Sequence, residues 1–239
     1  DWHSDLDFRL YCEDVLSPPE RWREARDLFR EKERAWRERG IKIDGCWVRK
    51  IGLIDAALSR WLAGTLAIED LTWTIWGYHL LPDLYHQHIL EDPWSVLAEW
   101  KDRLRVYPEA LKRSILDKHL GSLRYWRDDY HYENKVRRGD GVFLAGLSAR
   151  LVHDMMQVVF ALNETYFPGD GSNLEFARTF DLLPGDFTQR VHRVLYPIRS
   201  DAVFEEQRRA VLDLLADVEA LVERAGVEPR EGAIHQTGD

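Results

Sequence analysis

The sequence has only two cysteines, Cys12 and Cys46, among its 239 residues. Two thiols cannot build the network of disulfides that stabilises small secreted domains, and both cysteines lie inside short strand-like runs. We therefore expect two reduced, buried thiols and a cytoplasmic protein.

Three other features are missing. No apolar run approaches the roughly 18 uncharged residues that a membrane-spanning helix requires, and the first residues lack a signal-peptide pattern. There is also no basic excess, because 33 Lys and Arg stand against 42 Asp and Glu, a net charge of −9. Nonspecific nucleic-acid binding needs such an excess, so we expect neither a membrane nor a nucleic acid as a partner. A nucleotide carrying a metal ion is still compatible, since the metal supplies the positive charge.

The composition that is present, 45% apolar and 31% charged, is typical of a soluble globular protein.

The first 50 residues alternate between two structural patterns. Leu6–Cys12 and Ile41–Arg49 are rich in β-formers and aromatic residues, which predicts two strands. Between them, Ser17–Glu20 has the sequence of a helix start, and the helix is expected to run to about Arg39, before Gly40.

The remainder of the chain has a helical pattern. Helices are expected at about residues 53–66, 68–81, 94–105, 109–135, 141–167, 185–195 and 202–225. The segment Val142–Tyr166 is apolar mainly on one side, as in the buried central helix of a bundle. We therefore predict an α+β fold, with a small mixed β-sheet domain at 1–93, an all-α helical bundle at 94–226 and a loose tail at 227–239.

Three aspartates form the most informative pattern. Asp5 and Asp7 point to the same side of the first predicted strand, where two carboxylates repel each other unless a cation lies between them. Asp44 occupies the middle of the second predicted strand, where an unpaired carboxylate is costly to bury. If the strands are neighbours, the three carboxylates can bind Mg²⁺, and such a face is the scaffold of a two-metal site. An Asp-x-Asp pair alone is more often a solvated strand end, and Asp44 makes the two interpretations about equally strong.

The same residues carry a resemblance to a known family. Ser4–Phe8, with its Ser-Asp-x-Asp pattern, and Lys42–Val48, with a third Asp, resemble the polymerase-β-like nucleotidyltransferase superfamily. The architecture is similar to that of the antibiotic nucleotidyltransferases of the kanamycin and lincosamide types, in which a helical bundle follows a small catalytic domain. Leu120–Trp126 and Leu162–Gly169 resemble the helical domain of uncharacterised bacterial members.

The resemblance implies a role for each matching residue. Asp5 and Asp7 would bind Mg²⁺, Asp44 would act as a third ligand or as the base, and Ser4 would contact the nucleotide. The reaction would transfer a nucleoside monophosphate from a nucleoside triphosphate, expected to be ATP, to a hydroxyl of a small acceptor, with release of pyrophosphate. Two Mg²⁺ ions and a homodimer are also implied.

The resemblance also implies a Gly-Ser turn upstream of Asp5, and the given sequence starts at Asp1. We therefore expect either an N-terminally incomplete nucleotidyltransferase-like domain or a degenerate member. The alternative function is that of a non-catalytic member acting as a dimerisation or partner-binding module. A metal-dependent hydrolase using the same acids is a third hypothesis, and it lacks the histidine ligands that such sites commonly recruit.

Several residues of the second half are secondary candidates. A helical-domain Glu or Lys often assists catalysis in the family, which suggests Glu133 as a catalytic residue and Lys135 as a nucleotide contact. Arg124 is a further candidate for holding phosphate. The alternative is that Arg124 and Lys135 belong to a solvated stripe of one helix. The acidic pair at 91–92 is either a general base at the domain junction or a helix-ending pair.

Overall fold

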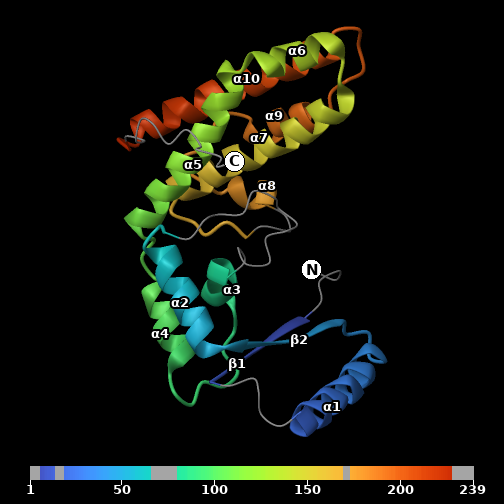
Figure 1. Cartoon of the computed structure of the whole chain (residues 1–239), viewed down its shortest axis with the longest axis vertical. Helices are drawn as coiled ribbons and strands as arrows, with labels where there is room; N and C mark the ends of the chain where they lie inside the picture. Colours follow the sequence, from blue (N-terminus) through green and yellow to red (C-terminus); the bar gives the residue numbers. More distant parts are fainter. Residues whose placement is uncertain (1–5, 14–18, 66–79, 169–172, 228–239) are drawn as a thin grey trace. The chain divides into compact units, whose positions relative to one another are not determined.

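The computed structural model describes residues 6–13, 19–65, 80–168 and 173–227, without the side chains of residues 19–22, 25 and 44 (Figure 1). Its contacts divide the chain into two compact units, Asp1–Ser59 and Arg60–Asp239. The structure is 66% helical with one small sheet near the N-terminus, which confirms the predicted α+β class.

The first unit is built on two strands joined by a helix. Strand β1 (Leu6–Cys12) is followed by helix α1 (Pro19–Arg37), strand β2 (Ile43–Lys50) and helix α2 (Ile51–Leu62), whose residues from Arg60 onward belong to the second unit. The two strands pair in parallel, so the described sheet is simpler than the mixed sheet that the sequence suggested. Parallel neighbours need a long crossover connection, and α1 supplies it.

Helix α1 packs against the sheet through an aromatic contact. The rings of Phe8 in β1 and Phe29 in α1 meet edge to face, with their centroids 6.3 Å apart. The chain then turns at Gly40, whose φ of +77° lies in the left-handed region that glycine tolerates best. Both predicted strands and the helix between them are therefore present, with ends that differ by at most two residues from the prediction.

The two thiols do not lie where the sequence placed them. Cys12 is half-buried and Cys46 is exposed, so the expectation of two buried thiols was wrong. The physical reason is the width of the sheet. A sheet of only two strands covers few side chains among the described residues of the first unit. Trp47 is 43% exposed and Leu10 is 51% exposed.

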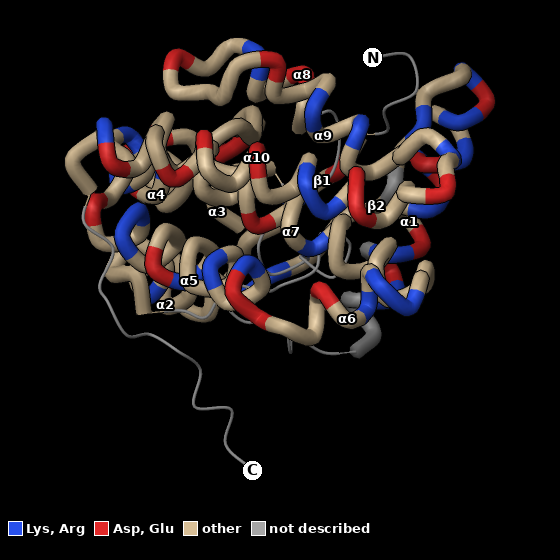
Figure 2. Tube along the Cα trace, turned by 90° about the horizontal axis from the view of Figure 1, so that it is seen from above, with Lys and Arg blue, Asp and Glu red and all other residues tan. Residues whose placement is uncertain are grey.

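The second unit is helical, and four of its helices pack against one long central helix (Figure 1). Its helices are α3 (Leu80–His86), α4 (Val96–Arg103), α5 (Glu109–Asp128), α6 (Tyr130–Arg138), α7 (Gly141–Leu162), α8 (Asn173–Ala177), α9 (Phe187–Leu195) and α10 (Val203–Arg224). Lys and Arg are interspersed with Asp and Glu along these helices, so basic and acidic side chains are close enough to pair (Figure 2).

Helix α7 is the core of this unit. It packs against α5, α6, α9 and α10, and every side chain from Leu151 to Leu162 is buried. By length and composition α7 could span a membrane, yet 67% of its most apolar stretch is buried inside the protein. This is the burial of a core helix in a soluble protein, and it matches the central helix that the sequence predicted.

Three predicted helix ends were wrong. The predicted helix 109–135 is in fact two helices, because the backbone of Asp129 is extended and interrupts it. The Asp129 carboxylate accepts a hydrogen bond from the backbone N–H of His131 at 2.8 Å and so caps the start of α6. Helix α7 ends at Leu162, since the side chain of Asn163 bonds the backbone N–H and C=O of Leu182 at 3.0 and 2.8 Å. Leu81-Pro82 lies in the first turn of α3, where proline is tolerated, and does not end a helix.

The predicted domain boundary at residue 93 falls inside the second unit. Helices on both sides of it are tied to the segment that follows α7. The hydroxyl of Tyr166 donates to the backbone oxygen of Leu104 at 3.1 Å, and the rings of Tyr166 and Tyr85 are 5.5 Å apart. Lys101 Nζ also donates to the backbone oxygen of Tyr85, at 2.6 Å.

Candidate functional site

The two strands that carry the predicted metal ligands are direct neighbours. Leu6 of β1 is paired with Ile43 of β2, and the next residue, Asp7, is paired with Gly45. Asp44 therefore has no partner in the register and is an extra residue in β2. The backbone N–H of Leu6 donates to the oxygen of Lys42 at 2.9 Å. The three-aspartate hypothesis requires that the two strands be neighbours, and the backbones of the two strands meet this condition.

The extra residue has a local cause in the sequence. Gly45 has a φ of +120°, a backbone conformation that residues with a Cβ rarely adopt. A glycine beside an extra residue is typical of a β-bulge, which bends one strand and changes the direction of a side chain. Bulges of this kind are frequent next to active sites. Asp44-Gly45 thus forms a bulge opposite Asp7.

Asp7 is accessible to a ligand. Its side chain is 44% exposed and lies 3.3 Å from Arg9 Nη1 in an ion pair on the same strand. An exposed pair of this type contributes between about 0 and 1 kcal/mol, so a divalent cation can displace it. Ser4 and Asp5 lie outside the described residues, as does the side chain of Asp44.

No group of three or more His, Cys, Asp or Glu side chains suited to a metal ion occurs among the described residues, which include neither Asp5 nor the side chain of Asp44. The residue types of the predicted set fit Mg²⁺, since carboxylate oxygens are the ligands that this ion takes in nucleotide sites.

The helical candidates all have partners within the second unit. Arg124 Nε donates to Glu219 Oε1 at 2.8 Å, which ties α5 to α10. Lys135 Nζ donates to Asp140 Oδ2 at 2.7 Å and lies 4.7 Å from the centre of the Phe143 ring. These contacts stabilise the bundle and are those expected of side chains that join neighbouring helices.

Two further acidic candidates have local partners. Glu133 pairs with Arg137 one turn later in α6, at 2.5 Å. Asp92 Oδ2 accepts a hydrogen bond from the backbone N–H of Ala98 at 2.9 Å. Asp92 therefore stabilises the beginning of α4, and its acidic pair precedes a helix rather than ending one.

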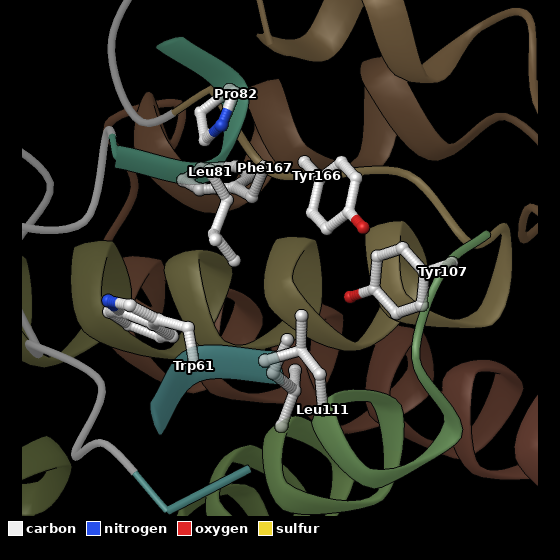
Figure 3. A pocket seen from close by; sticks show the side chains of 8 residues that line it. Trp61, Leu81, Pro82, Tyr107, Leu111, Tyr166 and Phe167 are labelled. Carbon is white, nitrogen blue, oxygen red and sulfur yellow. The ribbon is translucent and has the colours of Figure 1, made fainter. Parts of the chain in front are cut away.

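A cavity in the second unit is lined by aromatic side chains (Figure 3). It lies between α3, α5 and the segment after α7, and its lining includes Trp61, Tyr107, Tyr166 and Phe167. Burial raises the pKa of the Tyr166 hydroxyl well above its ordinary value. The accessible space is about 10 Å³, roughly that of one water molecule, so this cavity is too small for a nucleotide.

A buried polar pair was missed at the sequence level. His119 Nδ1 of α5 and Asp154 Oδ1 of α7 are 2.6 Å apart, and the two side chains are 0% and 4% exposed. His119 Nε2 and Asp154 Oδ2 have no hydrogen-bond partner among the described residues. The signal was available, because Asp154 is the only charged residue between Leu151 and Leu162.

The arrangement of this pair resembles that of a carboxylate orienting a catalytic imidazole. Catalysis also requires that the second imidazole nitrogen reach a substrate. His119 is fully buried in the contact between α5 and α7, so its Nε2 atom has no access to solvent in this structure. The geometry therefore supports a structural role for His119 and Asp154.

Part of the chain is similar to a known protein family. Residues 73–170 are similar to a family described as a domain of unknown function, DUF4037. This match spans less than half of the chain and includes α5, the whole of α7 and the His119–Asp154 pair. No curated protein and no solved structure gave a match to the chain.

Proposed function

We propose that this chain is a cytoplasmic, Mg²⁺-dependent nucleotidyltransferase that acts on a hydroxyl group of a small molecule. The observation that carries the proposal is the parallel pairing of β1 and β2, with the Asp44-Gly45 bulge opposite Asp7. This pairing puts the backbones of two predicted metal ligands on adjacent strands. Asp5, two residues before Asp7, completes the proposed set.

The chemistry follows from the type of ligand. Asp5, Asp7 and Asp44 would hold Mg²⁺ together with the phosphates of a nucleoside triphosphate, expected to be ATP. When bound there, Mg²⁺ would supply positive charge that offsets the charge on the transferred phosphoryl group and on the leaving pyrophosphate. The carboxylates would position these ions, and Asp44 is also proposed to accept the proton of the acceptor hydroxyl. Ser4 is proposed to contact the nucleotide, and the enzyme is proposed to act as a homodimer.

Nucleotide binding by the full chain tests this proposal. A fluorescent ATP analogue (mant-ATP) titrated in Mg²⁺ should bind the unaltered protein, and Asp7→Asn and Asp44→Asn should each weaken binding by about tenfold or more. Asp27→Asn is the matched control, because Asp27 lies in α1 with a side chain 66% exposed. Equal affinities for all four proteins would overturn the metal site.

Transfer requires a second measurement. Pyrophosphate release should increase when a hydroxylated acceptor is added, and Asp44→Asn should abolish that increase. Mg²⁺-dependent nucleotide binding without any release of pyrophosphate, across a panel of acceptors, would instead favour the non-catalytic partner-binding module. Light scattering of the full chain tests the proposed homodimer.

A further inference from the structure

A second possible ligand site lies within the helical unit. Helices α7, α8 and α9 surround a groove of about 460 Å³, which is within the usual range of about 300–1,000 Å³ for small-molecule pockets. Its apolar surface includes Val152, Met156, Phe167 and Val191. These four side chains are at most 7% exposed, so the groove has a floor that belongs to the packed core of the unit.

The groove also has a buried polar residue in its wall. His153 is 5% exposed, and its ring contacts those of His119, at a centroid distance of 5.9 Å, and Phe167, at 5.5 Å. Because His119 is in turn bonded to Asp154, the buried pair supports His153 from the side of the core. His153 therefore adds a polar side chain of fixed position to the lining of the groove.

The charge of the lining selects the type of ligand. Glu175 in α8 is the only Asp, Glu, Lys or Arg among the described residues that line the groove. Its carboxylate pairs with Arg178 at 2.9 Å, but both side chains are more than 60% exposed, and such a pair contributes little. His192, on α9, adds a second imidazole at the edge. The described lining therefore offers one carboxylate, two imidazoles and an apolar floor.

We propose that this groove binds a small molecule with an apolar or aromatic body and a primary ammonium group. The apolar body lies on Val152, Met156 and Phe167, and the ammonium group pairs with Glu175. An anionic ligand of the same size is disfavoured, because the described lining contains no Lys or Arg. This site does not depend on the proposed nucleotide site of the first unit.

Two probes of similar size and opposite charge test the proposal on the full chain. Isothermal titration calorimetry with phenethylamine should show saturable binding, at least tenfold tighter than that of phenylacetate. Glu175→Gln should remove most of this difference by weakening phenethylamine binding. Saturable binding with no charge preference, tighter binding of phenylacetate, or no binding of phenethylamine would overturn the proposal.

Two tryptophan substitutions test the location. Leu195 lines the groove at the end of α9, and helical side chains lean toward the N-terminus, so Leu195→Trp should cover Val191 and His192 and abolish binding. Val142→Trp is the control, because Val142 is 89% exposed on α7 and outside the groove. Equal binding by both variants would place the ligand elsewhere and overturn the assignment. If Leu195→Trp fails to fold, the effect of Glu175→Gln on phenethylamine binding still tests the location of the site. Asp7→Asn should bind phenethylamine as the unaltered protein does, which separates the test of this groove from the test of the nucleotide site.

Discussion

His119 and Asp154 connect helices α5 and α7 through a hydrogen bond of 2.6 Å in a region closed to solvent. The surrounding contact is mainly apolar, with Leu116 and Leu120 on α5 and Met155 and Val158 on α7 all fully buried. Burying two polar side chains costs free energy unless the helices are aligned so that the side chains bond each other. The pair therefore favours one alignment of the two helices over alternatives shifted along their axes.

We expect the removal of either partner to destabilise the protein. Asp154→Leu and His119→Leu each leave a buried polar group without its partner, and each should lower the free energy of unfolding by about 2–4 kcal/mol. Urea unfolding followed by circular dichroism measures the loss. Asp213→Ala, on the exposed side of α10, should change it by less than about 0.5 kcal/mol.

The double variant tests the coupling between the two residues. With both side chains apolar, no partner is left unsatisfied, so the combined loss should be clearly smaller than the sum of the two single losses. Additive losses would show that the two side chains do not stabilise each other.

Gly64 is expected to tolerate substitution poorly. It has a φ of +67°, and a Cβ atom at this position would lie 2.4 Å from the backbone oxygen of Ala110. Gly64→Ala should therefore lower the free energy of unfolding by about 2 kcal/mol or more, since it combines backbone strain with a collision. Thermal unfolding of the full chain measures this change.

Two other glycines separate these effects. Gly40 has a φ of +77° but open space around its Cβ position, so Gly40→Ala should show only the backbone strain, about 1 kcal/mol. Gly146 lies in α7 with neither constraint, and Gly146→Ala should stabilise the protein by about 0.5–1 kcal/mol. Equal effects at Gly64 and Gly40 would show that the contact with Ala110 is not restrictive.

Much of the fold could be predicted because local signals agree with the structure. Both strands of the first unit are bounded by polar, Gly or Pro residues, and the buried face of α7 has a clear apolar pattern. The break at Asp129 could not be predicted in the same way. It lies in a segment with neither Gly nor Pro, and one carboxylate that caps α6 is sufficient to interrupt the helix.

The candidate site was predictable only in part. The strand pattern placed Asp7 and Asp44 on two strands that were expected to be neighbours, and the backbone pairing agrees. The bulge depends on the φ of Gly45, which a glycine in a strand suggests but does not specify. The His119–Asp154 pair escaped notice because its residues are 35 positions apart and meet only when α5 packs on α7.

Asp129 should contribute to the pH dependence of stability. A hydrogen bond from the backbone N–H of His131 lowers the pKa of the Asp129 carboxyl, so the folded state favours the ionised form. This contribution is present above the unfolded pKa of about 3.9 and is lost as the pH falls through the lower folded value. Asp129→Asn should therefore make the loss of stability below about pH 4 less steep, as measured by urea unfolding from pH 7 to pH 3.

The capping role of Asp129 is separable from its charge. Asn is as good a helix cap as Asp, whereas Asp129→Ala should cost about 1 kcal/mol at pH 7. Similar losses at pH 7 for the Asn and Ala variants would contradict the capping role. An unchanged pH profile for Asp129→Asn would contradict the lowered pKa.

Glu219 should matter for stability and not for nucleotide binding. Its carboxylate accepts from Arg124 Nε at 2.8 Å and from Arg127 Nη1 at 2.9 Å, and its side chain is 18% exposed. Glu219→Gln weakens two charge-assisted contacts between α5 and α10, so we expect a loss of about 1 kcal/mol in the free energy of unfolding.

The same variant tests the phosphate role suggested for Arg124. Release of Arg124 from Glu219 should leave the affinity for mant-ATP in Mg²⁺ within twofold of that of the unaltered protein. A larger change in affinity, with stability unaffected, would assign Arg124 to the nucleotide site. Glu223→Gln, on an exposed position of the same helix, is the matched control.

The position of α7 among four other helices has a kinetic consequence. The amide hydrogens of its buried half, Leu151–Leu162, can reach solvent only when the helices that cover it separate, which amounts to unfolding of the whole unit. Deuterium should therefore enter the Leu151–Leu162 segment later than any other part of the second unit, at a rate set by global opening. Exchange along α6, whose outer face is exposed, should be complete long before.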